Sequence, residues 1–507
     1  MQNTHHSGFS STGFSTFRLK WLALSAVALF GSAPLATAAT FTIIATTNGE
    51  TSGATPFGPV IADAAGNLYT TMNAGGASGQ GTVIKLDASN NYAISTLVTF
   101  NTTNGSNPYA GLIADSAGNL YGTTYYGGTF GAGTVFKLNA SSNYALTTLV
   151  NFASSSTAPL NPRGILVNDA AGNLYSTTVS GGPTGATSYG TIFKLTAASG
   201  YTSYSQVANF TAATGVYPYC GVTIDAAGNL FGTTEAGVGN LGSLYEVAAN
   251  TSTITKLVTF TGTANGGRPY AAPIVDAAGN LYGTTNEGGT TNNGTVYKYN
   301  PSTSTLTTLV NFAFTNGAHP QGSLIADAVG NLYGTTTTGS NGGTVFKLDA
   351  SNNYALTTLA TLIKSQAALY ADGSGNLFGT SLSSPNGVIF KITGAAFVLA
   401  GDFTGDGHVN AADIAVMEQA LTNVSGYGQT HGGLMDSQVK SLGDINGDGK
   451  FTPADVQALI EKLKSGGGSA DPVPEPPALE LAALGTALLV ALQIRWIRPE
   501  KWLPLDC

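Results

Sequence analysis

The chain is poor in cysteine, in charge and in basic residues. Two cysteines among 507 residues, Cys220 and Cys507, cannot form a disulfide framework, so a large packed core has to stabilise the fold. Only 9% of the residues are charged, against roughly 25% in an average soluble domain. The net charge is −8 and the body of the chain has no run of Lys or Arg, so the composition argues against nucleic acid as a partner.

Residues 1–38 are predicted to form a secretory signal peptide. Arg18 and Lys20 precede an apolar run at 21–33, and the A-T-A pattern that ends at Ala38 places cleavage after that residue. An uncleaved N-terminal anchor is the alternative, but the run is short for a membrane span. The signal predicts an exported protein.

Glycine is abundant, with 67 residues, and it punctuates an internal repeat. The segment D-A-A-G-N-L-Y recurs with small changes at intervals of about 51 residues. A period near fifty residues, composed of short strands, predicts the blades of a β-propeller or the coils of a β-solenoid. The copies begin at Asp63, Asp115, Asp169, Asp225, Asp276, Asp327 and Asp372.

Each unit is predicted to contain four β-strands. In the second unit the apolar or alternating segments are 110–114, 120–124, 134–138 and 145–152. The gaps between them carry Gly, Asn, Asp or Ser, which supply the backbone angles that turns need. Four strands are the strand count of a propeller blade.

The two ends of the array complement each other. The seventh unit stops after its third strand, 388–392, whereas residues 40–45 match a fourth strand that lacks the first three. Pairing of these two segments would close the ring and hide its sheet edges. The sequence therefore predicts an all-β, seven-bladed propeller over residues 39–398, closed by its N-terminal strand.

The seven repeated aspartates are predicted to shape turns rather than to form a ring of acidic ligands. An Asp at the first position of a turn accepts backbone N–H bonds, and the Gly three residues later takes the positive φ of a short hairpin. This interpretation needs no ligand at the repeated acid.

Three tyrosines stand out in the P-Y-[AC]-[GA] links between blades: Tyr109, Tyr219 and Tyr270. Such links are expected on one face near the channel mouth, where aromatic rings are able to stack on sugars. The alternative is that the rings pack between blades as a ridge. The first, third and sixth units differ at this position, which excludes a seven-fold motif, and carry Phe57, Arg163 and Gln321.

Catalytic motifs are scarce. The body has a single histidine, His319, and no G-x-S-x-G, H-E-x-x-H or cysteine–histidine pairing. Hydrolysis of a glycoside needs two acids at a defined separation, which the sequence alone does not give for Glu235, Glu246 or Glu287. Glu235 and Glu287 fall in the same loop of their units, which keeps an enzyme open as an alternative.

The repeated segments N-L-Y-G-T-T, G-T-V-F-K-L and L-T-T-L-V-N-F resemble the tandem repeats of the bacterial choice-of-anchor, GloVer-type repeat proteins. The resemblance covers most of residues 40–398, whereas the D-x-x-G-N turn alone is common to many propellers. It implies a surface-attached protein with interchangeable C-terminal anchors, and it implies no particular activity.

After residue 398 the chain contains two loops rich in oxygen ligands. Oxygen-bearing side chains stand at positions 1, 3, 5, 9 and 12, Gly stands at position 6, and position 7 offers its backbone carbonyl. This spacing wraps a loop around one Ca²⁺, and each loop leads into apolar residues at helical spacing. The sequence therefore predicts two calcium ions. The predicted ligands are Asp402, Thr404, Asp406, His408, Asn410 and Asp413, followed by Asp444, Asn446, Asp448, Lys450, Thr452 and Asp455.

Two such loops, with Asp at position 12 and no preceding helix, resemble a type I dockerin over residues 399–464. The resemblance implies a cohesin-like partner. In that family, loop positions 10 and 11 help to select the partner; here they are Ala411, Ala412, Pro453 and Ala454, unlike the polar pairs of cellulosomal dockerins. The alternative is a calcium-rigidified spacer.

Residues 465–477 form a linker that ends in V-P-E-P, and a hydrophobic stretch with a basic cluster follows at 478–501. This order resembles the PEP-CTERM sorting signal, which implies processing by an exosortase and engagement of the membrane through the hydrophobic helix. Glu480 and the residues after 501 are atypical of that signal. A permanent C-terminal anchor is the alternative.

The sequence as a whole predicts an exported protein of a Gram-negative-type bacterium, located at the cell surface or outer membrane or in the extracellular matrix. Its propeller is expected to have a non-catalytic role in binding or adhesion, with extracellular polysaccharide as the candidate ligand. The alternatives are a polysaccharide-active enzyme, which would release reducing ends, and a structural matrix component, which would have no saturable ligand.

Overall fold

The computed structural model describes residues 38–464, except 154, 156–157, 183–188, 238–240, 363, 384–385, 406–407 and 432–433. The predicted signal peptide up to residue 37 and the predicted linker and sorting tail from residue 465 lie outside the described residues. Of the helices that are described, none has the length and apolar character that crossing a membrane requires.

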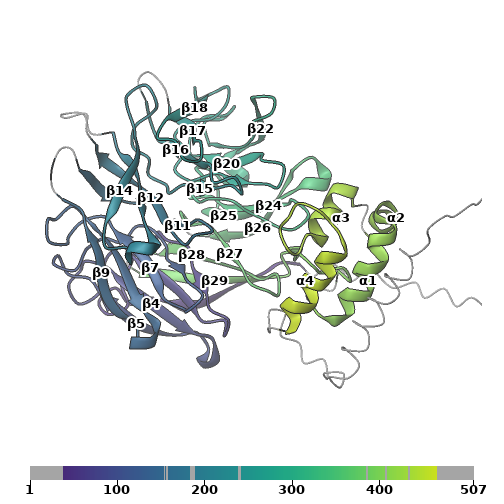
Figure 1. Ribbon diagram of the computed structural model, residues 1–507, viewed down its shortest axis with the longest axis horizontal. Coiled ribbons are helices and arrows are strands. Elements are labelled where there is room, and N and C mark those ends of the chain that lie inside the picture. The colour runs from purple at the N-terminus through teal and green to yellow at the C-terminus, as the bar shows by residue number, and fades with distance from the viewer. Residues whose placement is uncertain are drawn as a thin grey trace, which may run out of the picture. The chain divides into compact units, whose positions relative to one another are not determined.

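Seven β-sheets, counted over the described residues, form the blades of a β-propeller (Figure 1). In the first, second, fourth, fifth and sixth blades, four consecutive strands pair antiparallel from the innermost strand outward. The third blade has an additional strand, β10 (Pro159–Pro162), which pairs with β12. In chain order the remaining strands are β1 (Thr40–Thr46); β2 (Ile61–Ala62), β3 (Leu68–Met72), β4 (Thr82–Asp87), β5 (Ala93–Thr99); β6 (Ile113–Ala114), β7 (Leu120–Thr124), β8 (Thr134–Asn139), β9 (Ala145–Asn151); β11 (Val167–Asn168), β12 (Leu174–Gly181), β13 (Thr191–Leu195), β14 (Tyr204–Asn209); β15 (Thr223–Ile224), β16 (Leu230–Thr234), β17 (Ser243–Val247), β18 (Ile254–Thr259); β19 (Ile274–Val275), β20 (Leu281–Thr285), β21 (Thr295–Asn300), β22 (Thr305–Asn311); β23 (Ile325–Ala326), β24 (Leu332–Thr335), β25 (Gly343–Asp349), β26 (Ala355–Leu362); β27 (Tyr370–Ala371), β28 (Leu377–Ser383) and β29 (Asn386–Thr393).

The N-terminal strand closes the ring, as the sequence predicted. β1 is the outermost strand of the last blade, in the order β1-β29-β28-β27. It runs antiparallel to β29, with Thr40 opposite Thr393 and Thr46 opposite Val388. The propeller therefore joins its two ends through backbone hydrogen bonds, and the outer edge of β29 is covered.

The innermost strands are shorter than the sequence predicted. Instead of 110–114, the ladder of the second blade contains only β6 (Ile113–Ala114). The carbonyl of Ala110 accepts a hydrogen bond of 2.7 Å from Thr71 Oγ1, which belongs to the preceding blade. A Cβ on Gly58 would come within 2.7 Å of the Gly111 backbone. Close packing around the axis thus replaces strand pairing, and threonines at this position of the second strand link several pairs of neighbouring blades.

The cores of the propeller lie between adjacent blades. Val98 and Phe100 at the outer strand of the first blade pack with Leu120 and Phe136 of the second, and all four side chains are buried. The ring centroids of Phe100 and Phe136 are 5.2 Å apart. Because the same pattern recurs from blade to blade, each blade buries its apolar face only when its neighbour is present.

The repeated aspartates shape turns, as predicted. Asp63 Oδ1 accepts bonds from the backbone N–H groups of Ala65 (3.0 Å) and Asn67 (2.9 Å), and Gly66 has a φ of 78°. Asp63 Oδ2 accepts bonds from Asn67 Nδ2 (2.8 Å) and the Tyr69 hydroxyl (2.9 Å). The carboxylate is therefore occupied by its own turn.

The hydrogen bonds to the Asp63 carboxylate indicate that the free energy of unfolding depends on pH in the acid range. Burial raises the pKa of Asp63, but hydrogen bonds from Asn67 and Tyr69 outweigh burial, so the pKa lies below its usual value. A carboxyl with a depressed folded pKa stabilises the fold above its unfolded pKa of about 4, and that contribution is lost as the pH falls through the folded value. We expect Asp63→Asn to lower the free energy of unfolding at pH 7 by about 1–2 kcal/mol and to flatten its decline in acid.

Urea unfolding followed by circular dichroism at several pH values between about 2 and 7 measures this effect. Asp327→Asn is the matched control, because deep burial raises the pKa of Asp327 and gives its contribution the opposite sign. If both substitutions flatten the acid decline of the free energy of unfolding equally, Asp63 is not stabilised as a carboxylate by its turn.

The C-terminal module contains four helices within the described residues: α1 (Ala411–Thr422), α2 (Val424–Thr430), α3 (Asp436–Gly443) and α4 (Pro453–Lys464). Its core includes Phe403, Met417, Tyr427 and Leu459, all buried. The sequence predicted helices at α1 and α4, but it did not predict α2 and α3. The expectation that no helix precedes either loop is wrong for the second loop, because α3 ends at Gly443, immediately before that loop begins.

Candidate functional site

One residue from each blade lines a pocket at the centre of the ring, which we call the axial pocket. Each of these residues stands eleven positions before the first leucine or equivalent of its blade's second strand, so all seven occupy the same structural position. The cavity has a volume of about 230 Å³. The residues that occupy this position, and that line the cavity together with the residues next to them, are Phe57, Tyr109, Arg163, Tyr219, Tyr270, Gln321 and Gln366.

The structure brings together the three tyrosines that the sequence singled out, and their rings also pack on neighbours. Tyr219 stacks on Tyr270, with centroids 5.6 Å apart. Tyr109 stacks on Phe57, with centroids 5.3 Å apart. All four rings are partly exposed. The rings thus form a packed ridge and, at the same time, present aromatic surface to the axial pocket.

Sequence reasoning missed Gln366, the contribution of the seventh blade. The seventh unit has no Pro-Tyr pair there, so the P-Y-[AC]-[GA] pattern does not find it. The signal that finds it is distance along the chain: Gln366 precedes Leu377 by the same interval that separates Tyr109 from Leu120.

A strained backbone positions most of these side chains. Left-handed φ is unfavourable for residues with a Cβ, and more so before proline. Asn107 N donates to the Gln80 carbonyl (2.8 Å) and His319 N donates to the Asn293 carbonyl (2.8 Å), so bonds to the preceding blade hold the strained residue. Among the described residues, the residue that precedes the proline, two positions before the lining residue, has a positive φ in six blades. These residues are Thr55 (55°), Asn107 (54°), Asn161 (61°), Tyr217 (59°), Arg268 (51°) and His319 (57°).

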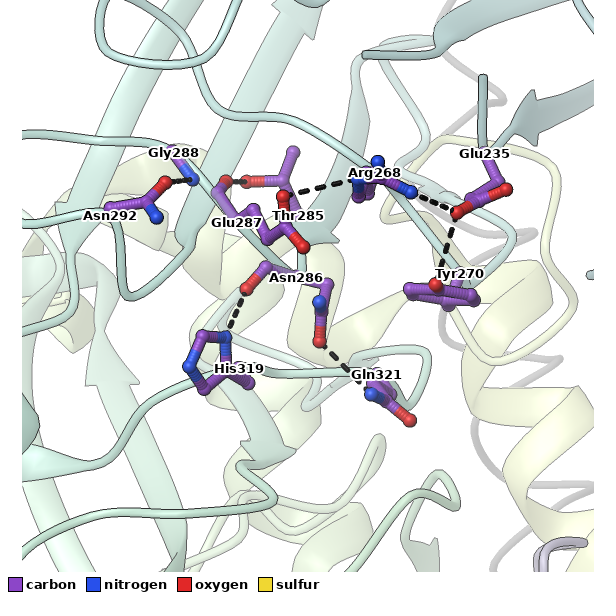
Figure 2. A network of polar contacts seen from close by, with 10 residues as sticks. All are labelled: Glu235, Arg268, Tyr270, Thr285, Asn286, Glu287, Gly288, Asn292, His319 and Gln321. Carbon is purple, nitrogen blue, oxygen red and sulfur yellow. Dashed lines mark hydrogen bonds and ion pairs between the residues drawn. The ribbon is translucent and has the colours of Figure 1, made fainter.

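A charged network borders the pocket beside Tyr270 (Figure 2). Arg268 contacts Glu235 at 2.5 Å and Glu287 at 3.1 Å, and the Tyr270 hydroxyl donates to Glu235 at 3.2 Å. The hydrogen bond to Glu235 raises the pKa of Arg268, and burial raises the pKa of Tyr270 to about 12. The two acids, which the sequence places in the equivalent loop of two different blades, are therefore joined by a single guanidinium. Glu246 lies on β17 and does not line the pocket.

The polar network continues on the far side of Glu287. His319 Nδ1 lies 2.8 Å from the Asn286 carbonyl, and Gln321 Nε2 donates to Asn286 Oδ1 at 3.0 Å. Figure 2 shows both side chains turned toward Asn286. His319 thus has a structural partner, and Gln321 is held in a defined orientation at the edge of the pocket.

Arg163 occupies the opposite, aromatic part of the pocket. Its guanidinium carbon lies 4.2 Å from the ring centroid of Tyr219 and 5.0 Å from that of Tyr109. Both distances are typical of cation–π contacts. Sequence reasoning treated Arg163 only as a departure from the tyrosine pattern, but the structure places it between two of the predicted tyrosines.

The two oxygen-rich loops place their last carboxylates in the core of the C-terminal module. Asp413 and Asp455 are fully buried. Asp413 accepts bonds from the N–H groups of Thr404 and Asn410, each 2.8 Å, and Asp455 accepts from the N–H groups of Ile445 (3.0 Å) and Thr452 (2.8 Å). These bonds bend each loop around its own acid.

The donor set of the second loop fits a calcium ion chemically. Asp444, Asn446, Asp448 and Thr452 bring hard oxygens, and Gly449 has the positive φ (76°) of the sharp turn. In the described residues, no three His, Cys, Asp or Glu side chains are grouped closely enough to hold a metal ion. Asp444 and Asp448 accept hydrogen bonds from backbone N–H groups of their own loop. Asp406, at position 5 of the first loop, lies outside the described residues, whereas Asp402, His408 and Lys450 are described at their loop positions.

The four residues at loop positions 10 and 11 are exposed. Ala411 and Ala412 begin α1, and Pro453 and Ala454 begin α4. The two helices pack against each other. The module thus presents two equivalent helix starts, one after each loop.

Comparison with known families identifies both parts of the chain. A family model described as the Gloeobacter/Verrucomicrobia repeat matches residues 30–202 and, as a second copy, residues 183–373. A model of the type I dockerin domain matches residues 400–464. No curated protein matches the chain.

Two solved structures illustrate what the chain is similar to. A streptogramin B lyase is 16% identical, with a TM-score of 0.47 over 70% of this chain and 97% of that chain. The virginiamycin B lyase of Staphylococcus aureus is 13% identical, with a TM-score of 0.47 over 70% of this chain and 99% of that chain. Neither likeness transfers an activity to the residues of the axial pocket.

Proposed function

Because the chain belongs to the Gloeobacter/Verrucomicrobia repeat family and carries a type I dockerin domain, we propose that its propeller is a non-catalytic module that binds polysaccharide outside the cell. Type I dockerins act in extracellular assembly, generally bind calcium and typically bind a cohesin, so the protein is extracellular or displayed at the cell surface. The observation that carries the binding proposal is the axial pocket, whose lining combines four aromatic rings with amide side chains.

This lining suits a sugar. Aromatic faces stack on the apolar faces of pyranose rings, and Gln321 and Gln366 offer amide donors and acceptors for hydroxyl groups. The cavity, at about 230 Å³, is smaller than the roughly 300–1,000 Å³ of typical small-molecule pockets. We therefore propose that it receives the end of a chain rather than its middle.

Loss of one stacking ring should weaken binding. We expect Tyr219→Ala to raise the Kd for a bound polysaccharide about five- to tenfold, equivalent to about 1–1.4 kcal/mol for an aromatic contact. Phe130→Ala is the control, because Phe130 is 54% exposed and lies outside the pocket. The measurement is protein bound to a panel of soluble and insoluble polysaccharides, with released reducing ends assayed in the same samples.

The same experiment decides between the function classes. Saturable binding that depends on Tyr219 and releases no reducing ends supports the proposal. Release of reducing ends that Glu235→Gln abolishes would replace it with a polysaccharide-active enzyme that uses the acids beside Arg268. Absence of any saturable ligand would replace it with a structural matrix component.

We further propose the mode of attachment. Each oxygen-rich loop binds one calcium ion, with the twelve predicted ligands in the roles given above, and the exposed positions Ala411, Ala412, Pro453 and Ala454 contact a cohesin-like partner. The hydrophobic tail at 478–501 engages the membrane of a Gram-negative-type bacterium until an exosortase processes it. A spacer role for the module would be indicated if no cohesin binds it in the presence of calcium.

A further inference from the structure

We infer that the axial pocket selects saccharides that carry a carboxylate, such as uronic acids, and that Arg163 is the residue that binds the acid group. This inference rests on the proposed binding function and adds the chemical class of the ligand. It starts from a difference between two arginines near the same pocket, because acids pair with only one of them.

The two arginines differ in their partners. Arg268 is neutralised, because Glu235 and Glu287 both contact its guanidinium. Arg163 is partly exposed, and within the described part of the chain neither an ion pair nor a hydrogen bond involves its side chain. A guanidinium has five N–H donors, and those of Arg163 remain available to a ligand in the pocket.

The tyrosines fix this guanidinium without satisfying its donors. Tyr109 and Tyr219 contact it through their ring faces, at 5.0 and 4.2 Å, and ring faces accept no conventional hydrogen bond. Such contacts orient the planar group and leave its edge free, which is the geometry that binds a carboxylate through two parallel hydrogen bonds. The side chain is thus arranged as an anion receptor before any ligand arrives.

The rest of the lining favours an acidic sugar over a simple anion. Tyr219 continues into a stack with Tyr270, so a ring bound through its carboxylate at Arg163 has an aromatic surface beside it. Gln321, oriented by Asn286, and Gln366 supply neutral polar groups for hydroxyls. The overall charge of −8 repels polyanions, so recognition of an acid has to come from this local site rather than from general attraction.

The test uses three matched trisaccharides: trigalacturonic acid, its methyl ester and galactotriose. We expect the protein to bind the acid about tenfold more tightly than the other two. Arg163→Gln should abolish this preference, so that the acid and galactotriose bind this variant equally well, whereas Arg163→Lys should keep part of the preference. Isothermal titration calorimetry gives the affinities, and the melting temperature confirms that each variant is folded.

Lys364→Gln is the matched control for the loss of one positive charge. Lys364 precedes Gln366 as Arg268 precedes Tyr270, and it does not line the axial pocket. An unchanged acid preference in this variant supports a specific role for Arg163, and an equal loss in both variants would overturn it. Equal affinity of the parent protein for the acid, the ester and galactotriose would overturn the inference but keep the proposed function. Binding to none of the three and to no polysaccharide of the panel would overturn both.

Discussion

Deletion of residues 39–46 should destroy the cooperative folding of the propeller. β1 supplies the outermost strand of the last blade, and its loss removes every backbone hydrogen bond between Thr40–Thr46 and β29. Phe41 also packs against the core that contains Phe390 and Ile392. We expect the melting temperature to fall by more than about 10 °C, which corresponds to a loss of roughly 8 kcal/mol in a domain of about 360 residues.

The exposed edge should also change the oligomeric state. An unpaired edge of β29 presents free N–H and C=O groups to other molecules, which favours association through strand addition. Calorimetry and light scattering after size-exclusion chromatography measure the two effects. Ile43→Ser is the control, because Ile43 is 52% exposed and its replacement leaves the strand pairing intact. A deletion variant that remains monomeric with an unchanged melting temperature would show that closure contributes nothing.

The closure was predictable because it depends on a strand-sized segment at each end of a regular repeat. The seventh unit lacks a fourth strand and residues 40–45 supply one, which backbone pairing then joins at β1 and β29. The shortening of the innermost strands was not predictable in the same way. It results from the bond between Thr71 and the Ala110 carbonyl, a contact across blades that no local pattern encodes.

The helices of the C-terminal module also differ in whether local sequence patterns predict them. α1 and α4 have apolar residues at helical spacing and were predicted. α2 (Val424–Thr430) contains two glycines and has no apolar period, so tertiary contacts, including the bond from the Tyr427 hydroxyl to the Phe403 carbonyl (2.6 Å), define it. α3 is short and is stabilised by its N-terminal bond from Met435 N to Gln438 Oε1 (2.9 Å).

At the candidate site, the sequence identified six of the seven lining positions and missed Gln366, and it did not predict which side chains contact one another. The P-Y pattern identified Tyr109, Tyr219 and Tyr270, and the structure places all three on one pocket. No sequence pattern pairs Arg163 with two of these rings or Arg268 with acids from two blades, because these contacts depend on distances between blades. The rings pack on each other, as the ridge alternative predicted, and they also line the pocket, so the ligand-binding role stays a prediction.

Removal of calcium should unfold the C-terminal module and leave the propeller intact. Asp413 and Asp455 are fully buried acids, and each loop adds two further acids within a few residues, so their negative charges repel one another unless a cation balances them. For a Kd of about 1 μM, 1 mM calcium stabilises the folded module by about 4 kcal/mol per ion. We expect a chelator to abolish a separate, calcium-dependent thermal transition and to reduce helical circular dichroism, while the β-sheet signal is retained.

Variants distinguish the loops from the rest of the module. Asp444→Ala, at position 1 of the second loop, should remove about half of the calcium-dependent stabilisation, whereas Asp436→Ala should keep it. Asp436 is an acid of the same module that accepts a hydrogen bond from the Ser425 hydroxyl (2.8 Å) and belongs to neither loop. If the chelator leaves the helical signal unchanged, the buried carboxylates are stabilised by their backbone N–H bonds alone, and the proposed calcium ions are not needed for the fold. If Asp444→Ala and Asp436→Ala lose the same share of the calcium-dependent stabilisation, the effect is not specific to the loop, and the calcium site proposed there is contradicted.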